Sequence, residues 1–308
     1  MVESDGRLMQ RRRPNAQQDS TVPPYEQLMA AVEAVRAAWD CRPQVALVLG
    51  TGLGDVAREI EVESVLPYEQ IPFLPSSTAV SHVGQLVCGR LNGVPVVAME
   101  GRLHAYEGYP LWQTTLPIRL FRAIGAETLI LCSAVGGLNP LYRAGDVMLV
   151  DDHICLMGDN PLIGINDPRL GPTRLDMCDA YDRQLAEEAV QVALRDRIPL
   201  HRGVLAALRG PNLETRSEYR LLRRIGADAV GMSMPPETIV ARHCGLKVLG
   251  FAVVTNVCLP DRLGPVGIDE IVDNANRAQP YLRHLLLALL ERWSQMPQQQ
   301  ASSVPSLV

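Results

Sequence analysis

The sequence of 308 residues lacks the features that would place it in several large classes of proteins. Its net charge is −5, so it has no excess of basic residues and nucleic acid is not an expected partner. No apolar run approaches the roughly 18 residues that a membrane-spanning helix needs. Met1–Asn15 includes Arg11–Arg13 but no apolar segment, so a secretory signal is not expected.

Motifs of fixed chemistry are also missing. There is no G-x-S-x-G turn of a serine hydrolase and no Gly-Lys-Ser/Thr of a phosphate-binding P-loop. The seven cysteines stand singly, without a C-x-x-C pair or zinc-ligand spacing, which predicts a reduced, cytoplasmic protein with most thiols in its core. Asp151-Asp152-His153 is a possible metal cluster, but a histidine beside acids more often belongs to a hydrogen-bonded turn. No metal and no organic cofactor is therefore expected.

The chain divides into one folded domain between two polar ends. Residues 1–22 are polar and irregular, and residues 295–308 are rich in Gln, Ser and Pro, so both ends are expected to be disordered. Residues 23–294 contain no linker, repeat or low-complexity break. Since 47% of the chain is hydrophobic, this domain has enough apolar material for a large core.

Short apolar runs alternate with longer segments of helical spacing. Because the runs are continuously apolar, both faces of the strands are expected to be buried. This predicts an α/β fold in which helices flank a central mixed, mostly parallel sheet. The expected strands are Val45–Leu49, Val94–Met99, Thr128–Ala134, Val147–Val150, Gly203–Leu208, Ala227–Met232 and Lys247–Thr255. The expected helices are Tyr25–Trp39, Leu111–Ile124, Ala180–Arg195, Glu218–Ile225, Glu237–Cys244 and Glu270–Trp293.

The segment that follows the run Val94–Met99 carries the strongest functional signal. Within six residues it brings together Arg102, His104, Tyr106 and Glu107. Open α/β sheets bind ligands at the carboxyl ends of their strands. Arginine offers a fixed fork of donors to phosphate or carboxylate, and histidine titrates near neutral pH. The pattern indicates an anion site beside a polar organic ligand; a surface turn of solvated charges is the alternative.

Three other strand ends carry small or hydroxyl-bearing residues that suit an anion. Thr51 lies in the turn Gly50–Gly54, although a plain tight turn is the more frequent meaning of such a segment. Ser133-Ala134 either allows a ligand to approach the backbone or simply packs against a helix. Ser233 caps the next helix, donates to an anion at that helix N-terminus, or does both.

Two further polar residues suit the edge of a heterocyclic base. Asn256 ends the last apolar run, and its amide offers both a donor and an acceptor. The carboxylate of Glu214, in Gly210–Thr215, can accept a ring N–H. A turn-forming asparagine and a solvated acid at a helix start are equally compatible with these positions.

Taken in chain order, these segments resemble the purine nucleoside phosphorylases of the trimeric class, within the purine nucleoside phosphorylase and methylthioadenosine phosphorylase family. The similarity covers roughly residues 25 to 290. The matching segments are Gly50–Gly54, His82, Gly101–Pro110, Gly136–Asn139, Asn166-Asp167, Asp179–Asp182, Gly210–Thr215, Gly226–Ser233, Val240–Gly245 and Thr255-Asn256. The resemblance implies a nucleoside phosphorylase fold and reversible cleavage of purine (deoxy)ribonucleosides by phosphate into free base and (deoxy)ribose 1-phosphate.

The resemblance also implies a role for particular residues. The phosphate site would consist of Thr51, His82, Arg102, His104, the Ala134 backbone and Ser233; the sugar site of Tyr106, Met232 and Ile268; and the base site of Leu213, Glu214 and Asn256. His104, Glu214 and Asn256 would carry catalysis, and Glu107 would orient the phosphate-site histidine. Arg174 and Leu175 would complete the site of a neighbouring subunit in a homotrimer.

Four departures from the family pattern bear on substrate preference. Leu213 and Arg174-Leu175 stand where the family usually has phenylalanine, and the chain has only three, at 73, 121 and 251. Ser133 replaces a usual asparagine, and Ile268 a histidine that contacts the sugar 5′-hydroxyl.

Three readings of function are therefore weighed. The resemblance implies that Asn256 favours 6-oxopurines such as inosine and guanosine, because the adenosine-type relatives have Asp there. Ile268 favours instead a 5′-methylthio or otherwise substituted nucleoside. A non-catalytic nucleoside-binding protein is the third possibility, against which the retained polar residues argue.

Overall fold

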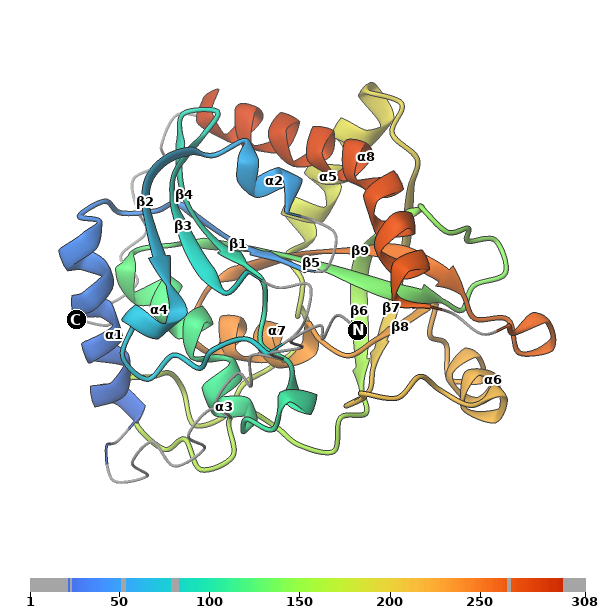
Figure 1. Ribbon diagram of the computed structural model, residues 1–308, viewed down its shortest axis with the longest axis horizontal. Coiled ribbons are helices and arrows are strands. Elements are labelled where there is room, and N and C mark those ends of the chain that lie inside the picture. The colour runs from blue at the N-terminus through green and yellow to red at the C-terminus, as the bar shows by residue number, and fades with distance from the viewer. Residues whose placement is uncertain (1–21, 23, 51–53, 79–82, 265–266, 296–308) are drawn as a thin grey trace, which may run out of the picture.

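The central strand β1 (Val45–Leu49) is buried along its whole length, because helices cover both faces of the sheet to which it belongs. In the computed structural model, which describes residues 22, 24–50, 54–78, 83–264 and 267–295, alternate residues of β1 enter two different apolar clusters. Ala46 and Val48 pack with helices on one face of the sheet, whereas Val45, Leu47 and Leu49 pack with helices on the other face. The layers are visible in Figure 1, with α8 (Ile268–Gln295) above the sheet and α7 (Pro235–His243) below it.

The remaining strands and helices have the following bounds. The other strands are β2 (Glu61–Pro67), β3 (Gln85–Leu91), β4 (Val94–Glu100), β5 (Thr128–Gly137), β6 (Val147–Cys155), β7 (Leu200–Ala207), β8 (Ala229–Gly231) and β9 (Lys247–Val257). The α-helices are α1 (Pro24–Ala38), α2 (Asp55–Arg58), α3 (Leu111–Thr114), α4 (Leu116–Ile124), α5 (Arg183–Arg195), α6 (Arg216–Arg224), α7 (Pro235–His243) and α8 (Ile268–Gln295). Short 3₁₀ turns are η1 (Tyr68–Gln70), η2 (Ala105–Glu107) and η3 (Pro260–Arg262).

The strands of the described residues form one sheet whose far half closes on itself. Its order is β2-β3-β4-β1-β5-β8-β7-β6-β9, and β9 also pairs with β5, so the last five strands make a ring. Five strand pairs are parallel and four are antiparallel. The prediction of a mixed, mostly parallel sheet flanked by helices is therefore confirmed.

Strands β1, β4 and β5 position the candidate site. They run parallel, with Val45 opposite both Val96 and Thr128. Their carboxyl ends therefore point to the same edge of the sheet. Beyond that edge β5 continues, and its last residues pair with β8 and β9. Residues after β4, β8 and β9 are thus brought towards β5.

The seven predicted strands and six predicted helical segments are all present, with differences at their ends. The segment Leu111–Ile124 is two helices, α3 and α4, which meet at Thr115 just before Pro117. Proline lacks a backbone N–H and clashes with the preceding turn, which explains the interruption. Three elements, α2, β2 and β3, were not predicted from the sequence. Strand β2 is a mostly exposed edge strand, and Gly89 interrupts the apolar pattern of β3.

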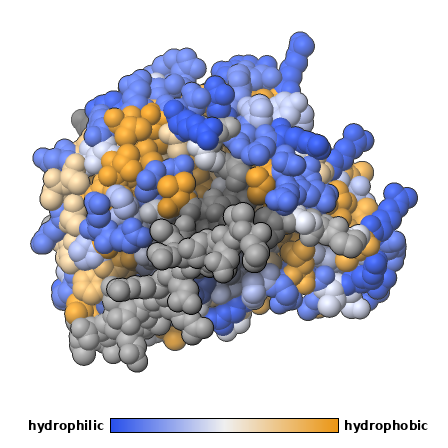
Figure 2. All heavy atoms as spheres, in the orientation of Figure 1, coloured by the Kyte–Doolittle hydropathy of each residue, from blue (hydrophilic) through white to orange (hydrophobic). Residues whose placement is uncertain are grey.

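The outer surface reflects the same layering. In α8, Leu282, Leu285, Leu286 and Leu289 are fully buried against the sheet. Figure 2 shows mainly hydrophilic residues along the top of the molecule, where α8 lies, and a group of hydrophobic residues over β2 and β3. Within the described residues, no helix is both long enough and apolar enough to cross a membrane. The tails predicted at 1–22 and 295–308 lie almost wholly outside the described residues.

Candidate active site

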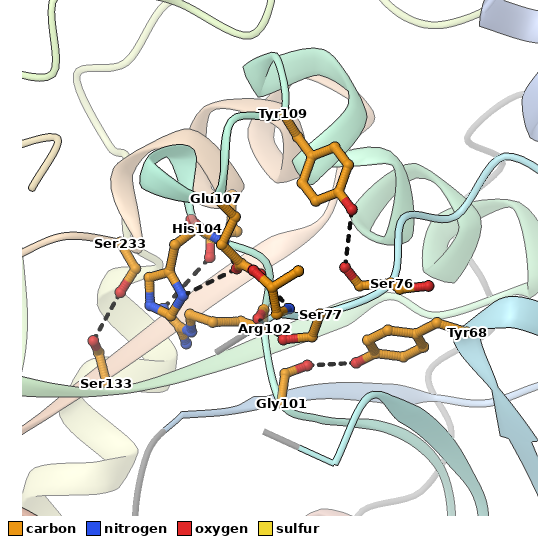
Figure 3. A network of polar contacts seen from close by, with 12 residues as sticks. Tyr68, Ser76, Ser77, Gly101, Arg102, His104, Glu107, Tyr109, Ser133 and Ser233 are labelled. Atoms are coloured by element: carbon orange, nitrogen blue, oxygen red, sulfur yellow. Dashed lines mark hydrogen bonds and ion pairs between the residues drawn. The ribbon is translucent and has the colours of Figure 1, made fainter. Parts of the chain in front are cut away.

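Arg102 is a buried cation just beyond the end of β4. Its side chain is only 2% exposed to solvent. One guanidinium nitrogen, Nη2, donates to the carbonyl of Cys132 on β5 at 2.5 Å, and Nη1 lies 3.4 Å from a carboxylate oxygen of Glu237 (Figure 3 shows the surrounding network). A guanidinium stays charged at any physiological pH, so burial requires such partners. The two contacts hold the fork of donors in one orientation.

Glu237 is the main residue of the site that the sequence analysis did not assign. It lies in the first turn of α7 and is only 6% exposed. Its second carboxylate oxygen accepts from the backbone N–H of Met234 at 2.9 Å. Met234 has φ +83°, a conformation that L-residues rarely adopt, so the carboxylate stabilises a strained turn. Glu237 is the third residue of α7, and an acidic residue at that position commonly bonds back to the N-cap backbone N–H. This position in the sequence was the signal that could have identified it.

The serines of two neighbouring elements meet beside this cation. The hydroxyl oxygens of Ser133 on β5 and Ser233, before α7, lie 2.9 Å apart, and both side chains are at most 5% exposed. The suggestion that Ser233 caps α7 is wrong, because Met234 occupies the N-cap, and its backbone N–H is bonded to Glu237. Since Ser133 follows Cys132 directly, the serine pair is held close to the partners of Arg102.

Glu107 fixes the segment that carries His104. One of its oxygens accepts from the His104 backbone N–H at 2.7 Å and lies 3.6 Å from the imidazole Nδ1. The other accepts from the N–H and the hydroxyl of Thr78, at 2.6 and 2.7 Å. Burial alone would raise the pKa of Glu107, but these hydrogen bonds outweigh it and lower the pKa from 4.5 to about 2. The carboxylate is therefore ionised and orients the imidazole, which stacks on Tyr106 with ring centres 4.7 Å apart.

Three more hydrogen bonds anchor this segment to its surroundings. The hydroxyl of Tyr68 donates to the carbonyl of Gly101, and that of Tyr109 donates to the carbonyl of Ser76 at 3.1 Å. Ser77 donates to the carbonyl of Arg102 at 3.4 Å. In Figure 3 these groups surround the segment from the side opposite to the serine pair. The backbone on either side of Arg102 is thus fixed.

The two residues predicted to bind a base are both buried at 8% exposure. The amide nitrogen of Asn256 donates to the sulfur of Cys258 at 3.1 Å, and its oxygen accepts from the hydroxyl of Thr255 at 3.1 Å. Burial raises the pKa of Glu214. Leu213, by contrast, is 47% exposed, so about half of it is open to solvent.

Of the remaining residues predicted to bind sugar or phosphate, some have described side chains and others do not. Met232 packs against Gly210, where φ is +69° and an added Cβ would lie 2.3 Å from the methionine sulfur. Ile268 begins α8, but its side chain, like Thr51 and His82, is outside what the structure describes. Ala134, on β5 next to Ser133, is half-buried.

Arg174 and Leu175 lie apart from these groups. Arg174 is exposed. Leu175 lines a cavity of about 550 Å³ with Met177, Ile239 and other residues, and none of the described residues predicted to bind phosphate, sugar or base is in that lining.

Two residues of the possible metal cluster Asp151-Asp152-His153 interact with other side chains instead of with each other. Asp151 is ion-paired with Arg202 at 2.8 Å, and the imidazole of His153 lies 3.2 Å from the hydroxyl of Tyr181. In the part of the chain that the structure describes, no group of three or more His, Cys, Asp or Glu side chains is arranged to hold a metal ion.

Comparisons with known proteins agree on one family. The family model described as the phosphorylase superfamily matches residues 44–291. The purine nucleoside phosphorylase of Bos taurus is 42% identical over 273 residues, which are 86% of this chain and 94% of that protein. Purine nucleoside phosphorylase 1 of Bacillus subtilis is 44% identical over 251 residues, covering 82% and 93%. A crystal structure of schistosoma purine nucleoside phosphorylase with hypoxanthine has a TM-score of 0.84 at 32% identity, covering 90% of this chain and all of that one.

The lowered pKa of Glu107 predicts a pH-dependent contribution to stability. Because the folded pKa of about 2 lies below the usual 4.5, the ionised carboxylate stabilises the fold above pH 4.5, and this is lost as the pH falls towards 2. The free energy of unfolding of Glu107→Gln should therefore differ most from that of the unmodified protein above pH 4.5. Urea unfolding from pH 7 to pH 2, with the exposed Glu69→Gln as control, measures this; a difference that does not vary with pH would contradict it.

Proposed function

Since this chain belongs to the phosphorylase superfamily and is a purine nucleoside phosphorylase, we propose that it acts on 6-oxopurine nucleosides such as inosine and guanosine. The reaction is reversible: a purine (deoxy)ribonucleoside and phosphate give the free base and (deoxy)ribose 1-phosphate. Inorganic phosphate is a co-substrate of this enzyme family. The free state of all seven cysteines supports a location in the cytoplasm.

The buried and fixed guanidinium of Arg102 is the observation that carries the proposed mechanism. Together with His104, Ser233 and the Ala134 backbone, it would hold the phosphate dianion; Thr51 and His82 are proposed to join them. Arg102 is already held by Glu237 and the Cys132 carbonyl, so its donors need no reorganisation when phosphate binds. Arginine suits this role because its planar fork matches the oxygens of phosphate.

The chemistry needs charge stabilisation on both sides of the bond that breaks. The C1′–N9 bond gives its electron pair to the base, and a phosphate oxygen forms a new bond to C1′. Positive charge develops on the sugar and negative charge on the purine. Phosphate beneath the sugar stabilises the first, and the Asn256 amide N–H, donated to the N7 and O6 side of the purine, stabilises the second. The Glu214 carboxylate would accept the purine N1–H.

The sugar site remains open to two substrate classes. Tyr106, stacked on His104, and Met232, packed on Gly210, are proposed to lie against the ribose. Ile268, proposed at the 5′ position, is apolar and so favours a 5′-methylthio group over a hydroxyl. A 5′-methylthio or substituted purine nucleoside is therefore the second candidate substrate. Leu213 supports tolerance of bulky bases, because its exposed side chain leaves that end of the site open.

We also propose that the protein is a homotrimer in which Arg174 and Leu175 complete a neighbour's site. The apolar cavity that Leu175 lines, next to Ile163 at 72% exposure, supports a subunit contact there. Light scattering should give three times the chain mass of 33.8 kDa. Leu175→Glu should lower the mass and the activity, whereas Leu141→Glu, at a residue 77% exposed elsewhere, should change neither. A fully active monomer of the unmodified chain would refute the proposal.

Cleavage of inosine should depend on phosphate. The attacking atom is a phosphate oxygen, so the rate of hypoxanthine release should rise from near zero to saturation as phosphate is added. A coupled assay for hypoxanthine in phosphate-free and phosphate-containing buffer measures this. Equal release in both buffers would make the enzyme a hydrolase.

Asn256→Asp should shift preference from 6-oxo towards 6-amino purines. A carboxylate accepts from an exocyclic amine but repels a carbonyl oxygen, since it offers no N–H. The ratio of kcat/KM for inosine to that for adenosine should fall at least tenfold, of the order of one lost hydrogen bond plus a repulsion. Asn276→Asp, at an exposed site on α8, controls for added charge. An unchanged ratio in Asn256→Asp would remove Asn256 from the base site.

A further inference from the structure

Two buried side chains lie between Glu214 and Asn256, which come from different parts of the chain. Tyr219 on α6 and Cys258, one residue beyond β9, are each 1% exposed. The sulfur of Cys258 accepts from the Asn256 amide at 3.1 Å. The Tyr219 hydroxyl interacts with both the Cys258 thiol and the Glu214 carboxylate, since each of these groups shifts the pKa of Tyr219. The four side chains therefore form a buried polar bridge beside the proposed base site.

The two middle members of the bridge are held rigidly. The backbone N–H of Cys258 donates to the carbonyl of Gly137 at 2.7 Å. A Cβ at Gly136 would lie 2.6 Å from the Cys258 sulfur, so the sulfur occupies space that only glycine leaves free. Tyr219 packs in an apolar cluster that also contains Leu222 and Cys258. Neither side chain can move away from its polar partners without disturbing the core.

The hydrogen-bonding capacity of each group gives the bridge one consistent direction. A carboxylate only accepts hydrogen bonds, so the Tyr219 hydroxyl is the group that can donate towards Glu214. The oxygen of Tyr219 then accepts from the Cys258 thiol, whose sulfur accepts from the amide of Asn256. Burial raises the pKa of Cys258 to about 11 and also raises that of Tyr219, so both keep their protons at neutral pH. The remaining N–H of Asn256 is left for a ligand.

We propose that Tyr219 and Cys258 are positioning residues that set base specificity, by holding the Asn256 amide and the Glu214 carboxylate in the orientation that fits a 6-oxopurine. A terminal amide presents nearly the same shape when rotated by half a turn, but its donor and acceptor then exchange places. The sulfur of Cys258, which accepts from the nitrogen side, opposes that rotation. This inference rests on the proposed function, because it assumes that Glu214 and Asn256 contact the base.

The test compares kinetic constants for three substrates in matched variants. Tyr219→Phe, Cys258→Ala and Cys258→Ser alter the bridge. Tyr142→Phe, which removes a buried hydroxyl bonded to the carbonyl of Arg202, and Cys88→Ala, at a buried site in β3, are the controls. For each protein, kcat and KM are measured with inosine, adenosine and phosphate, together with the melting temperature.

Loss of one bridging hydrogen bond should raise the KM for inosine about 3- to 10-fold in Tyr219→Phe and Cys258→Ala. The KM for phosphate should stay within about twofold, because neither residue contacts the phosphate site. In Cys258→Ala the inosine-to-adenosine ratio of kcat/KM should fall at least about threefold, since the amide is free to rotate. Cys258→Ser should recover part of that ratio, because a hydroxyl both donates and accepts.

The pH profile gives an independent readout for Tyr219. Burial and the nearby charge of Glu218 raise the pKa of Glu214, whereas the interaction with the Tyr219 hydroxyl lowers it. Tyr219→Phe removes this hydroxyl and leaves Glu218 in place. The acid limb of the pH profile of kcat/KM for inosine should therefore move to higher pH in this variant. A role in packing alone would leave that limb in place.

The outcomes separate this inference from the proposed function. If the unmodified enzyme shows no phosphate-dependent cleavage, the proposed function fails and the inference with it. If it does cleave, and Asn256→Ala loses discrimination between the two bases, but the bridge variants match the controls, only the inference is overturned. The inference is also overturned if the kinetic constants for inosine, adenosine and phosphate all worsen together, in step with a fall in the melting temperature.

Discussion

The site depends on the burial of one permanent positive charge at the end of β4. Removing the guanidinium of Arg102 from water costs several kcal/mol unless partners replace the water. The Cys132 carbonyl on β5 and the Glu237 carboxylate on α7 offset this cost. Because Glu237 also stabilises the strained turn at Met234, the same charge fixes the turn that carries Ser233. Three elements that are distant in the sequence are thereby brought to one point.

The sheet makes that convergence possible, and its ring of five strands extends it to the base side. Parallel β1, β4 and β5 present their carboxyl ends at one edge, and β5 continues past that edge to pair with β8 and β9. Glycines at 136 and 137 allow this close pairing, since a Cβ at either position would collide with a neighbouring side chain. Asn256 on β9 and Ser133 on β5 therefore lie on two paired strands, although they are proposed to act on opposite sides of the bond that breaks.

The sequence was sufficient to predict the strands that form the core and the cluster after β4, because both rest on local patterns: continuous apolar runs, and polar residues at a strand end. It failed where the deciding contact is not local. Strand β2 is exposed at the sheet edge and has no apolar run to reveal it. Glu237 pairs with a residue 135 positions earlier, and Tyr219 reaches Cys258 only after α6 and β9 have packed. A capping role for Ser233, one of the two that its sequence position allowed, is excluded because Met234 takes the N-cap position in the folded turn.

The central claim is that Arg102, held by Glu237 and β5, is the cation that binds the attacking phosphate. The most direct test is the kcat/KM for phosphate of Arg102→Met, a substitution that keeps an apolar stem of similar length but removes the charge and all donors. With inosine saturating and folding verified by circular dichroism, we expect a fall of about 10²- to 10³-fold, the usual effect of losing a preorganised donor to a reacting anion. A fall of less than about threefold in a folded protein would contradict the account.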